Sequence, residues 1–351
     1  MSPPNSPVPL DAPDQRLAGL ATWAAEALGT SGFTLAPASA DASFRRYFRL
    51  TFANGAATPH PHATLIGMDA PPPQEDCRPF VHVARLLIEA GVHAPEVLAA
   101  DLERGYLLLT DLGTRTYLDA LDATSAPALY SDAIDSLIRW QCASRDGALP
   151  PYDEALLRRE LELFPEWYAA RHLGRPLDTA QRHTLDDAFR RIVANNLAQP
   201  RVFVHRDYHS RNLMVCTRNP GVLDFQDAVH GPITYDLMSL LRDAYIAWDE
   251  EQQIDWAARY WERARRASLP VGDDFGQFWQ DFEWMGVQRQ LKVLGIFARL
   301  FHRDGKAGYL ADMPRVMAYL RGACERYNAL TPLLRLIDAL EGRAAVTGYT
   351  V

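Results

Sequence analysis

A short stretch with strand-like character interrupts a long helical region, and this interruption constrains the fold more than any other feature of the chain. From residue 114 onward, apolar residues recur at helical spacing on both sides of it. Residues 201–228 break that period with two short apolar runs, 202–204 and 221–223, separated by a polar stretch. We expect the two runs to form a β-hairpin buried in the middle of a helical lobe. The helices expected before the hairpin cover residues 117–121, 126–145, 154–172 and 181–197.

The first 110 residues follow another pattern, in which helical periodicity alternates with pairs of short strand-like segments joined by turns. The expected helices there cover residues 14–28 and 80–90, and the expected strands cover 44–52, 63–68, 95–101 and 105–110. The sequence therefore predicts an α+β chain with a small β-rich N-terminal lobe at 13–110, a hinge at 111–113 and a larger, mainly helical lobe at 114–351. Residues 1–12 are rich in Pro and Ser and are expected to form a disordered tail.

Composition limits the class of protein. The formal net charge is -8, from 36 basic and 44 acidic side chains, which argues against nucleic acid as the main partner. The four cysteines are scattered and have no spacing suited to zinc, as in a reduced cytosolic protein. No apolar run approaches the roughly 18 residues of a membrane span, and no secretory signal is apparent. We expect a cytoplasmic monomer that binds neither nucleic acid nor a membrane.

The polar stretch between the two apolar runs carries the strongest chemical signal. Phosphoryl transfer needs one carboxylate to accept a proton from the attacking hydroxyl, and oxygen ligands to hold Mg²⁺ on the phosphates. Asp207 suits the first role; Asn212, five residues on, and Asp224, at the end of the second apolar run, suit the second. Any one of His205, Asp207 and Asn212 alone is more often a turn or cap residue. The combination, with His205 two residues before Asp207, favours a kinase-type site.

On these residues the chain resembles the protein-kinase-like phosphotransferases, and among them the aminoglycoside and choline kinases, from about residue 32 to residue 320. The resemblance implies a protein-kinase-like bilobal fold, with ATP as co-substrate and Mg²⁺ as cofactor. It implies that Asp207 is the catalytic base and that Asn212 and Asp224 bind the metal. It further implies that Asp236 braces the catalytic loop, while His209, two residues past the base, is typical of the small-molecule branch.

The same resemblance places the adenine of ATP against the hinge, where backbone groups of Asp111, Leu112 and Gly113 are expected to bind it. The loop expected to cover the phosphates falls at residues 40–47 and contains no glycine. Ser43 and Phe44 are the expected phosphate contacts in that loop.

A kinase of this kind normally carries a lysine on its third strand, which here corresponds to residues 64–69. No lysine precedes Lys292 in this chain. We expect either Arg46 or Arg49 to replace that lysine on the phosphates, or magnesium to supply the positive charge alone.

Several segments resemble the bacterial N-acetylmuramate/N-acetylglucosamine anomeric kinases of cell-wall recycling, which phosphorylate the C1 hydroxyl of the sugar. These segments are residues 45–49, 68–72, 108–113, 160–167, 294–300 and 303–306. The resemblance suggests Glu160, Trp167 and His209 as sugar contacts, and Arg211 or Arg242 as partner of the lactyl carboxylate. For Trp167, core packing on a helix is favoured over a sugar contact.

Two other functions stay open at this point. One is a small-molecule kinase with a different alcohol acceptor, such as choline, homoserine or an aminoglycoside. The other is a nucleotide-binding pseudokinase, which the missing lysine favours and the intact set of Asp207, Asn212 and Asp224 opposes.

Overall fold

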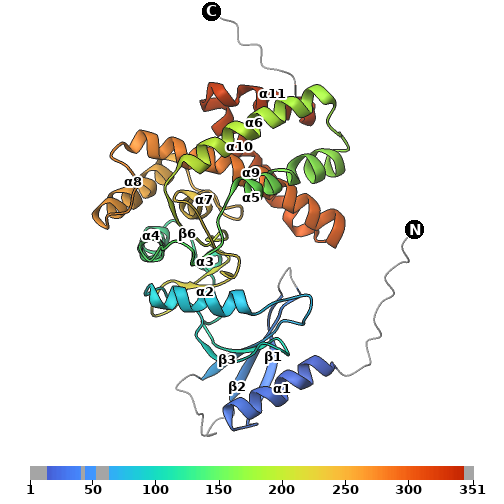
Figure 1. The fold of residues 1–351 in the computed structure, drawn as a ribbon, viewed down its shortest axis with the longest axis vertical. Coiled ribbons are helices and arrows are strands. Elements are labelled where there is room, and N and C mark those ends of the chain that lie inside the picture. Colours follow the sequence, from blue (N-terminus) through green and yellow to red (C-terminus); the bar gives the residue numbers. More distant parts are fainter. Residues whose placement is uncertain (1–13, 41–43, 53–62, 344–351) are drawn as a thin grey trace, which may run out of the picture. The chain divides into compact units, whose positions relative to one another are not determined.

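The computed structural model describes residues 14–40, 44–52 and 63–343, and these form two compact units (Figure 1). The N-terminal unit comprises Met1–Arg85 and Ala94–Gly113, and the C-terminal unit comprises Leu86–His93 and Thr114–Val351. The expected tail at residues 1–12 lies outside the described residues. In the described ranges, no helix combines the length and apolar character needed to cross a membrane.

An antiparallel sheet of five strands, in the order β1-β2-β3-β5-β4, organises the N-terminal unit. Its strands are β1 (Phe33–Ala40), β2 (Arg46–Phe52), β3 (Thr64–Asp69), β4 (Val97–Asp101) and β5 (Tyr106–Thr110). Helix α1 (Gln15–Leu28) buries Leu20 and Trp23 in the core of this unit. Leu50 and Leu65, which pair with each other across β2 and β3, are fully buried in the same core.

The sequence predicted the pairing of β2 with β3 and of β4 with β5, but it did not predict β1. Residues Phe33–Ala40 contain Pro37 and several small side chains, which have low strand propensity. Because β1 stands at the end of the strand order, a proline can be accommodated there. Helix α2 (Arg78–Glu89) also matches expectation, and its residues from Leu86 on belong to the C-terminal unit.

Helices dominate the C-terminal unit, as predicted, and the long helix α9 (Phe275–Asp304) lies at its centre. It packs against α5, α6, α7, α8 and α10 and the π-helix η1 (Figure 1). Between residues 283 and 298 almost every side chain of α9 is buried, whichever way it points. The other helices are α3 (Tyr117–Ala120), α4 (Ala126–Cys142), α5 (Glu154–Leu161), η1 (Phe164–His172), α6 (Thr179–Ala198), α7 (Tyr235–Leu241), α8 (Glu250–Arg266), η2 (Ala307–Asp312), α10 (Met313–Arg326), η3 (Asn328–Leu330) and α11 (Thr331–Glu341).

The predicted hairpin between residues 202–204 and 221–223 is wrong in its pairing. Strand β6 (Arg201–Val204) pairs with β9 (Val229–Pro232), and β7 (Leu213–Met214) pairs with β8 (Gly221–Val222). The β9 segment, Val-His-Gly-Pro, has little strand character of its own. Its Gly231 is required because a Cβ there would lie 2.6 Å from the Cβ of Tyr152. The polar stretch is therefore held at its two ends by two separate strand pairs.

The expected single helix at residues 154–172 is divided into α5 and η1. Pro165, one residue inside η1, has no N–H and disrupts regular α-helical hydrogen bonding there. Helix α9 passes the junction at very short range, since a Cβ on Gly295 would lie 2.4 Å from the carbonyl carbon of Leu163. Only glycine permits this approach, which places the polar side chains of α5 beside α9.

A buried carboxylate fastens α9 to the helices around it. Glu283 accepts hydrogen bonds from Arg242 (2.8 Å), from Arg326 (3.0 Å) and from the hydroxyl of Tyr327 (2.6 Å). The Glu283 side chain is 1% exposed, so these three donors compensate a charge that water does not reach.

We predict that Glu283→Ala lowers the free energy of unfolding by about 3–5 kcal/mol, because it leaves a buried arginine without its partner. Urea denaturation followed by circular dichroism measures this. The matched control is Glu250→Ala, which removes an exposed carboxylate from the same Arg326 and is expected to cost at most about 1 kcal/mol. Equal losses in the two variants would contradict the role given to Glu283.

Candidate active site

Two residues, one in the polar stretch and one directly after the second apolar run, have backbone conformations that only a well-fixed surrounding can maintain. Arg206 has φ = 78° and Asp224 has φ = 61°, both in the left-handed region. Asp236 fixes the first of them, since its two carboxylate oxygens accept the backbone N–H groups of His205 (2.7 Å) and Arg206 (3.0 Å). The prediction that Asp236 braces this loop is confirmed.

The imidazole of His205 ties the loop to the second strand pair. Its Nε2 lies 3.0 Å from the carbonyl oxygen of Leu223, and its Nδ1 accepts the N–H of Asp207. Burial lowers the pKa of His205 to about 4, so the ring is neutral at physiological pH. One neutral ring thus links the residue before Asp224 to the backbone of Asp207.

The two predicted metal ligands lie side by side. The Asn212 amide nitrogen is 3.3 Å from an Asp224 carboxylate oxygen, and it also donates to the carbonyl of Asp207 (3.0 Å). The other Asp224 oxygen accepts from Gln226 (3.0 Å). An amide oxygen and a carboxylate are hard donors that suit Mg²⁺. The described residues contain no group of three or more His, Cys, Asp or Glu that could hold a metal, so phosphate oxygens and water would complete such a site.

Asp207 is ionised despite its burial. Burial by itself raises the pKa of this carboxyl, but Lys292, His209 and Arg289 outweigh that effect and lower the pKa to about 2. Lys292 and Arg289 are three residues apart on α9 and therefore lie on the same face of that helix. Neither residue was predicted to take part in the site.

Glu160, predicted as a sugar contact, has both carboxylate oxygens occupied by donors from its own chain. One oxygen binds Arg206 and Lys292 (2.9 Å), and the other accepts from the hydroxyl of Tyr152 and the amide of Gln288 (3.0 Å). Its side chain is 7% exposed. The structure thus uses Glu160 to join α5, the loop and α9.

The remaining predicted substrate residues have different surroundings. Arg211 is exposed and lies 3.6 Å over the ring of Tyr245, and His209 packs edge-on against the same ring at 5.4 Å. The Nδ1 atom of His209 is buried and has no partner in the described part of the chain. Trp167 is half-buried on η1. Arg242 is buried and forms an internal ion pair with Glu283. Its partner in the structure is therefore Glu283, in place of the lactyl carboxylate that was predicted.

The nucleotide-binding candidates belong to the N-terminal unit. Arg46 is paired with Asp69 on β3, and Arg49 makes two hydrogen bonds to Asp111 (2.5 and 3.1 Å) and one to the carbonyl of Gly113 (2.9 Å). Both guanidinium groups, predicted as phosphate ligands, thus already hold carboxylates. A further two expected phosphate contacts are Phe44, which is 67% exposed, and Ser43, which lies outside the described residues.

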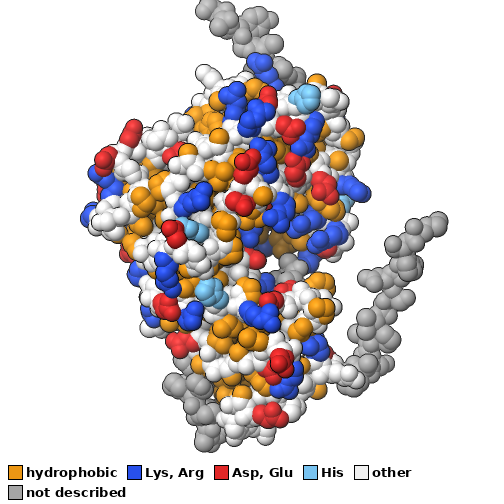
Figure 2. Space-filling model, in the orientation of Figure 1, with side chains coloured by type: hydrophobic (Ala, Val, Ile, Leu, Met, Phe, Trp, Pro, Cys, Tyr) orange, Lys and Arg blue, Asp and Glu red, His pale blue; other side chains and the backbone are white. Residues whose placement is uncertain are grey.

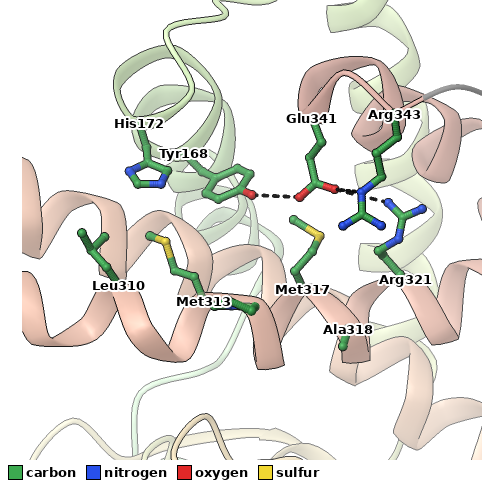
Figure 3. Close-up of a pocket in the computed structure, with 10 residues that line it drawn as sticks. Tyr168, His172, Leu310, Met313, Met317, Ala318, Arg321, Glu341 and Arg343 are labelled. Carbon is green, nitrogen blue, oxygen red and sulfur yellow. Dashed lines mark hydrogen bonds and ion pairs between the residues drawn. The ribbon is translucent and has the colours of Figure 1, made fainter.

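A cavity of about 410 Å³ lies within the C-terminal unit, among η1, η2, α10 and the last turn of α11 (Figure 3). Glu341 accepts from the hydroxyl of Tyr168 (3.2 Å) and pairs with Arg321 (3.5 Å) and Arg343 (2.9 Å) along its edge (Figure 3). No predicted site residue lines the cavity. Figure 2 shows basic and acidic side chains interspersed over the visible face of the C-terminal unit.

Residues 34–271 match the phosphotransferase enzyme family. The chain belongs to this family. It is 49% identical over 341 residues to the N-acetylmuramate/N-acetylglucosamine kinase of Pseudomonas putida, covering 94% of this chain and 98% of that one. It is 47% identical to the protein of the same name from Neisseria meningitidis serogroup B, covering 96% and 99%.

Similar solved structures include the streptomycin–ATP complex of aminoglycoside phosphotransferase APH(2'')-IIa, with a TM-score of 0.57 and 13% identity over 88% of this chain and 97% of that one. A choline/ethanolamine kinase family protein from Mesorhizobium loti has a TM-score of 0.57 and 14% identity, over 87% and 92%. These similarities confirm the predicted protein-kinase-like fold. Membership of this phosphotransferase family implies ATP as co-substrate and, typically, a divalent metal ion.

The Glu160 cluster predicts a specific dependence of stability on pH. Burial acts to raise the pKa of Glu160, but Lys292 and Arg206 outweigh it and lower the pKa from 4.5 to about 2. Because the folded pKa is depressed, this stabilisation is present above the unfolded pKa and is lost as the pH falls toward 2. Between about pH 5.5 and about pH 3, the wild type should lose about 2 kcal/mol more stability than Glu160→Gln, which cannot titrate.

Urea denaturation of both proteins across this pH range measures the two free energies of unfolding. The other titrating groups are the same in both proteins, so their contributions cancel in the difference. At neutral pH, Glu160→Gln should itself be less stable than the wild type by about 3–5 kcal/mol. Parallel pH profiles for the two proteins would refute the proposed pairing.

Proposed function

We propose that this protein transfers the γ-phosphate of ATP to the anomeric C1 hydroxyl of N-acetylmuramate and of N-acetylglucosamine, as a step in the recycling of cell-wall peptidoglycan. The observation that carries the proposal is near-full-length identity of about one half to kinases named for these two sugars. The geometry around Asp207 supports it, because a buried and ionised carboxylate stands next to a pair of hard oxygen ligands.

Asp207 would act as the general base. Its carboxylate accepts the proton of the C1 hydroxyl while that oxygen forms a bond to the γ-phosphorus and the bond to the β-phosphate oxygen of ATP breaks. Asn212 and Asp224 would hold Mg²⁺, which neutralises charge on the phosphates when bound. The brace from Asp236 and the His205 ring would keep Asp207 in place during the transfer.

The N-terminal unit would bind the nucleotide, with the adenine against the backbone of Asp111, Leu112 and Gly113. Arg49 supports this part of the proposal in an indirect way, since it bonds to both ends of that segment and would fix its conformation. For Arg46 or Arg49 to contact phosphate, as the replaced lysine would, each would have to exchange its carboxylate partner for the phosphate. Phe44 and Ser43 remain proposed contacts of the phosphate-covering loop.

For the acceptor, His209 supplies a buried nitrogen that has no hydrogen-bond partner among the described residues, and it lies within electrostatic reach of Asp207. Together with Arg211 and Trp167 it would contact the sugar. We further propose that the protein acts as a monomer in the cytoplasm.

An acceptor panel tests this function. The purified protein with ATP and Mg²⁺ should release ADP with N-acetylmuramate and N-acetylglucosamine, but not with choline, homoserine or kanamycin. Turnover of one of the last three alone would keep the phosphotransferase chemistry and refute the sugar assignment. ATP binding without turnover of any acceptor would favour the pseudokinase.

Asp207→Asn should lower kcat about 10²- to 10⁴-fold, because the amide cannot accept the proton. Nucleotide affinity, measured by isothermal titration calorimetry, should be unchanged. Asp255→Asn, at an exposed residue of α8 paired with Arg259, is the matched control and should retain full activity. A variant Asp207→Asn with near-normal kcat would remove Asp207 from the mechanism.

Asp224→Asn tests the metal site separately from the base. Loss of the carboxylate charge should raise the Mg²⁺ concentration needed for half-maximal rate at least about tenfold. A titration of rate against Mg²⁺ at saturating ATP measures this. An unchanged requirement would show that the metal is held elsewhere.

A further inference from the structure

Arg289 is a buried arginine without a partner. It is 5% exposed in the middle of α9, yet it makes no hydrogen bond or ion pair with any residue in the described part of the chain. Arg242, which is equally buried and directly follows the last residue of α7, is bound to Glu283 and Gln253. A buried guanidinium normally has such partners, because the cost of removing its charge from water is large.

The surroundings of Arg289 identify where its guanidinium lies. Burial acts to lower its pKa, but Tyr235, Asp207, Asp243 and Tyr245 outweigh that effect and raise it, so the group stays charged. The same guanidinium lowers the pKa of Asp207 and influences that of His209. Arg289 therefore lies close to Asp207, the proposed base, and to His209, a proposed sugar contact.

Two carboxylates in this region, Asp243 and Glu160, already have other partners. Asp243 accepts the backbone N–H groups of Ser210 (2.9 Å) and Tyr245 (3.0 Å), one on each oxygen. Glu160 is bound by Lys292, the residue one helical turn from Arg289 on α9. Asp207, the proposed base, acts on Arg289 electrostatically but forms no hydrogen bond or ion pair with it. Within the described part of the chain, the guanidinium of Arg289 is thus available to a bound anion.

An anion with two oxygens in one plane suits this group best, since the guanidinium fork matches a carboxylate. The two sugars of the proposed function differ in this respect: N-acetylmuramate carries a 3-O-lactyl carboxylate, and N-acetylglucosamine has a hydroxyl there. We propose that Arg289 binds the lactyl carboxylate and determines the preference for N-acetylmuramate. This inference rests on the proposed function and adds the residue that separates its two substrates.

The test compares both sugars on the same variant. Arg289→Gln should lower kcat/KM for N-acetylmuramate about 10- to 100-fold, the effect of losing a charge-assisted hydrogen-bonded pair. The value for N-acetylglucosamine should change by less than about threefold. Arg303→Gln, at an exposed arginine near the end of the same helix, is the matched control and should change neither value.

A second arm removes the charge from the ligand. The wild type should phosphorylate the methyl ester of N-acetylmuramate as poorly as Arg289→Gln phosphorylates the acid. The variant acting on the ester should show no further fall in kcat/KM, because both changes remove the same interaction. This arm also decides the matter if Arg289→Gln does not fold. In that case, a kcat/KM of the wild type that is at least tenfold lower for the ester than for the acid supports the proposal. Equal kcat/KM values for acid and ester overturn it.

The transferred phosphate is the other anion that Arg289 could bind. In that case Arg289→Gln would lose activity with both sugars to the same degree, and the carboxylate assignment would be overturned. A wild type that phosphorylates neither sugar would instead refute the proposed function itself, so the two failures are distinguishable.

Discussion

The carboxylate of Glu160 is the interaction on which the rest of the site depends. It is buried between Arg206 and Lys292, and so it joins α5, the loop before Asp207 and the central helix α9. Arg206 holds a left-handed backbone conformation that costs free energy, and the Glu160 ion pair and the Asp236 hydrogen bonds together compensate that cost. Because Arg206 directly precedes Asp207, fixing the one fixes the other. The position of the proposed base thus depends on Glu160 of α5, Asp236 of α7 and Lys292 of α9, which are distant from one another in the sequence.

One face of α9 serves the site in two ways. Lys292 is one of only two lysines in the chain, and its charge is used inside the protein to hold Glu160. Arg289, three residues earlier on the same face, has a similar degree of burial and no hydrogen-bond or ion-pair partner among the residues that the structure describes. The first residue therefore stabilises the loop, while the second is left to bind a ligand. An arrangement of this kind explains why a helix buried on all sides carries two cations at its centre.

The sequence was sufficient to predict the fold class and the grouping of Asp207, Asn212 and Asp224, because these three residues are close together in the sequence. It was not sufficient for features that depend on long-range contacts. The partner of β6 is β9, whose Val-His-Gly-Pro sequence has little strand character, so the hairpin was paired wrongly. Arg242 and Glu160 were expected to contact substrate, yet each meets an internal partner that is distant in sequence. Arg289 and Lys292 could have been noticed as charged residues in an apolar helix, but only the structure separates the paired cation from the unpaired one.

The central claim is that this chain phosphorylates an amino sugar at its anomeric position. The most direct test is the phosphorus NMR spectrum of the product formed from N-acetylmuramate, ATP and Mg²⁺. A phosphate signal coupled to the anomeric proton is the predicted result, since the C1 hydroxyl is the proposed nucleophile facing Asp207. A signal coupled instead to the protons of C6, or to any other ring position, would contradict the account.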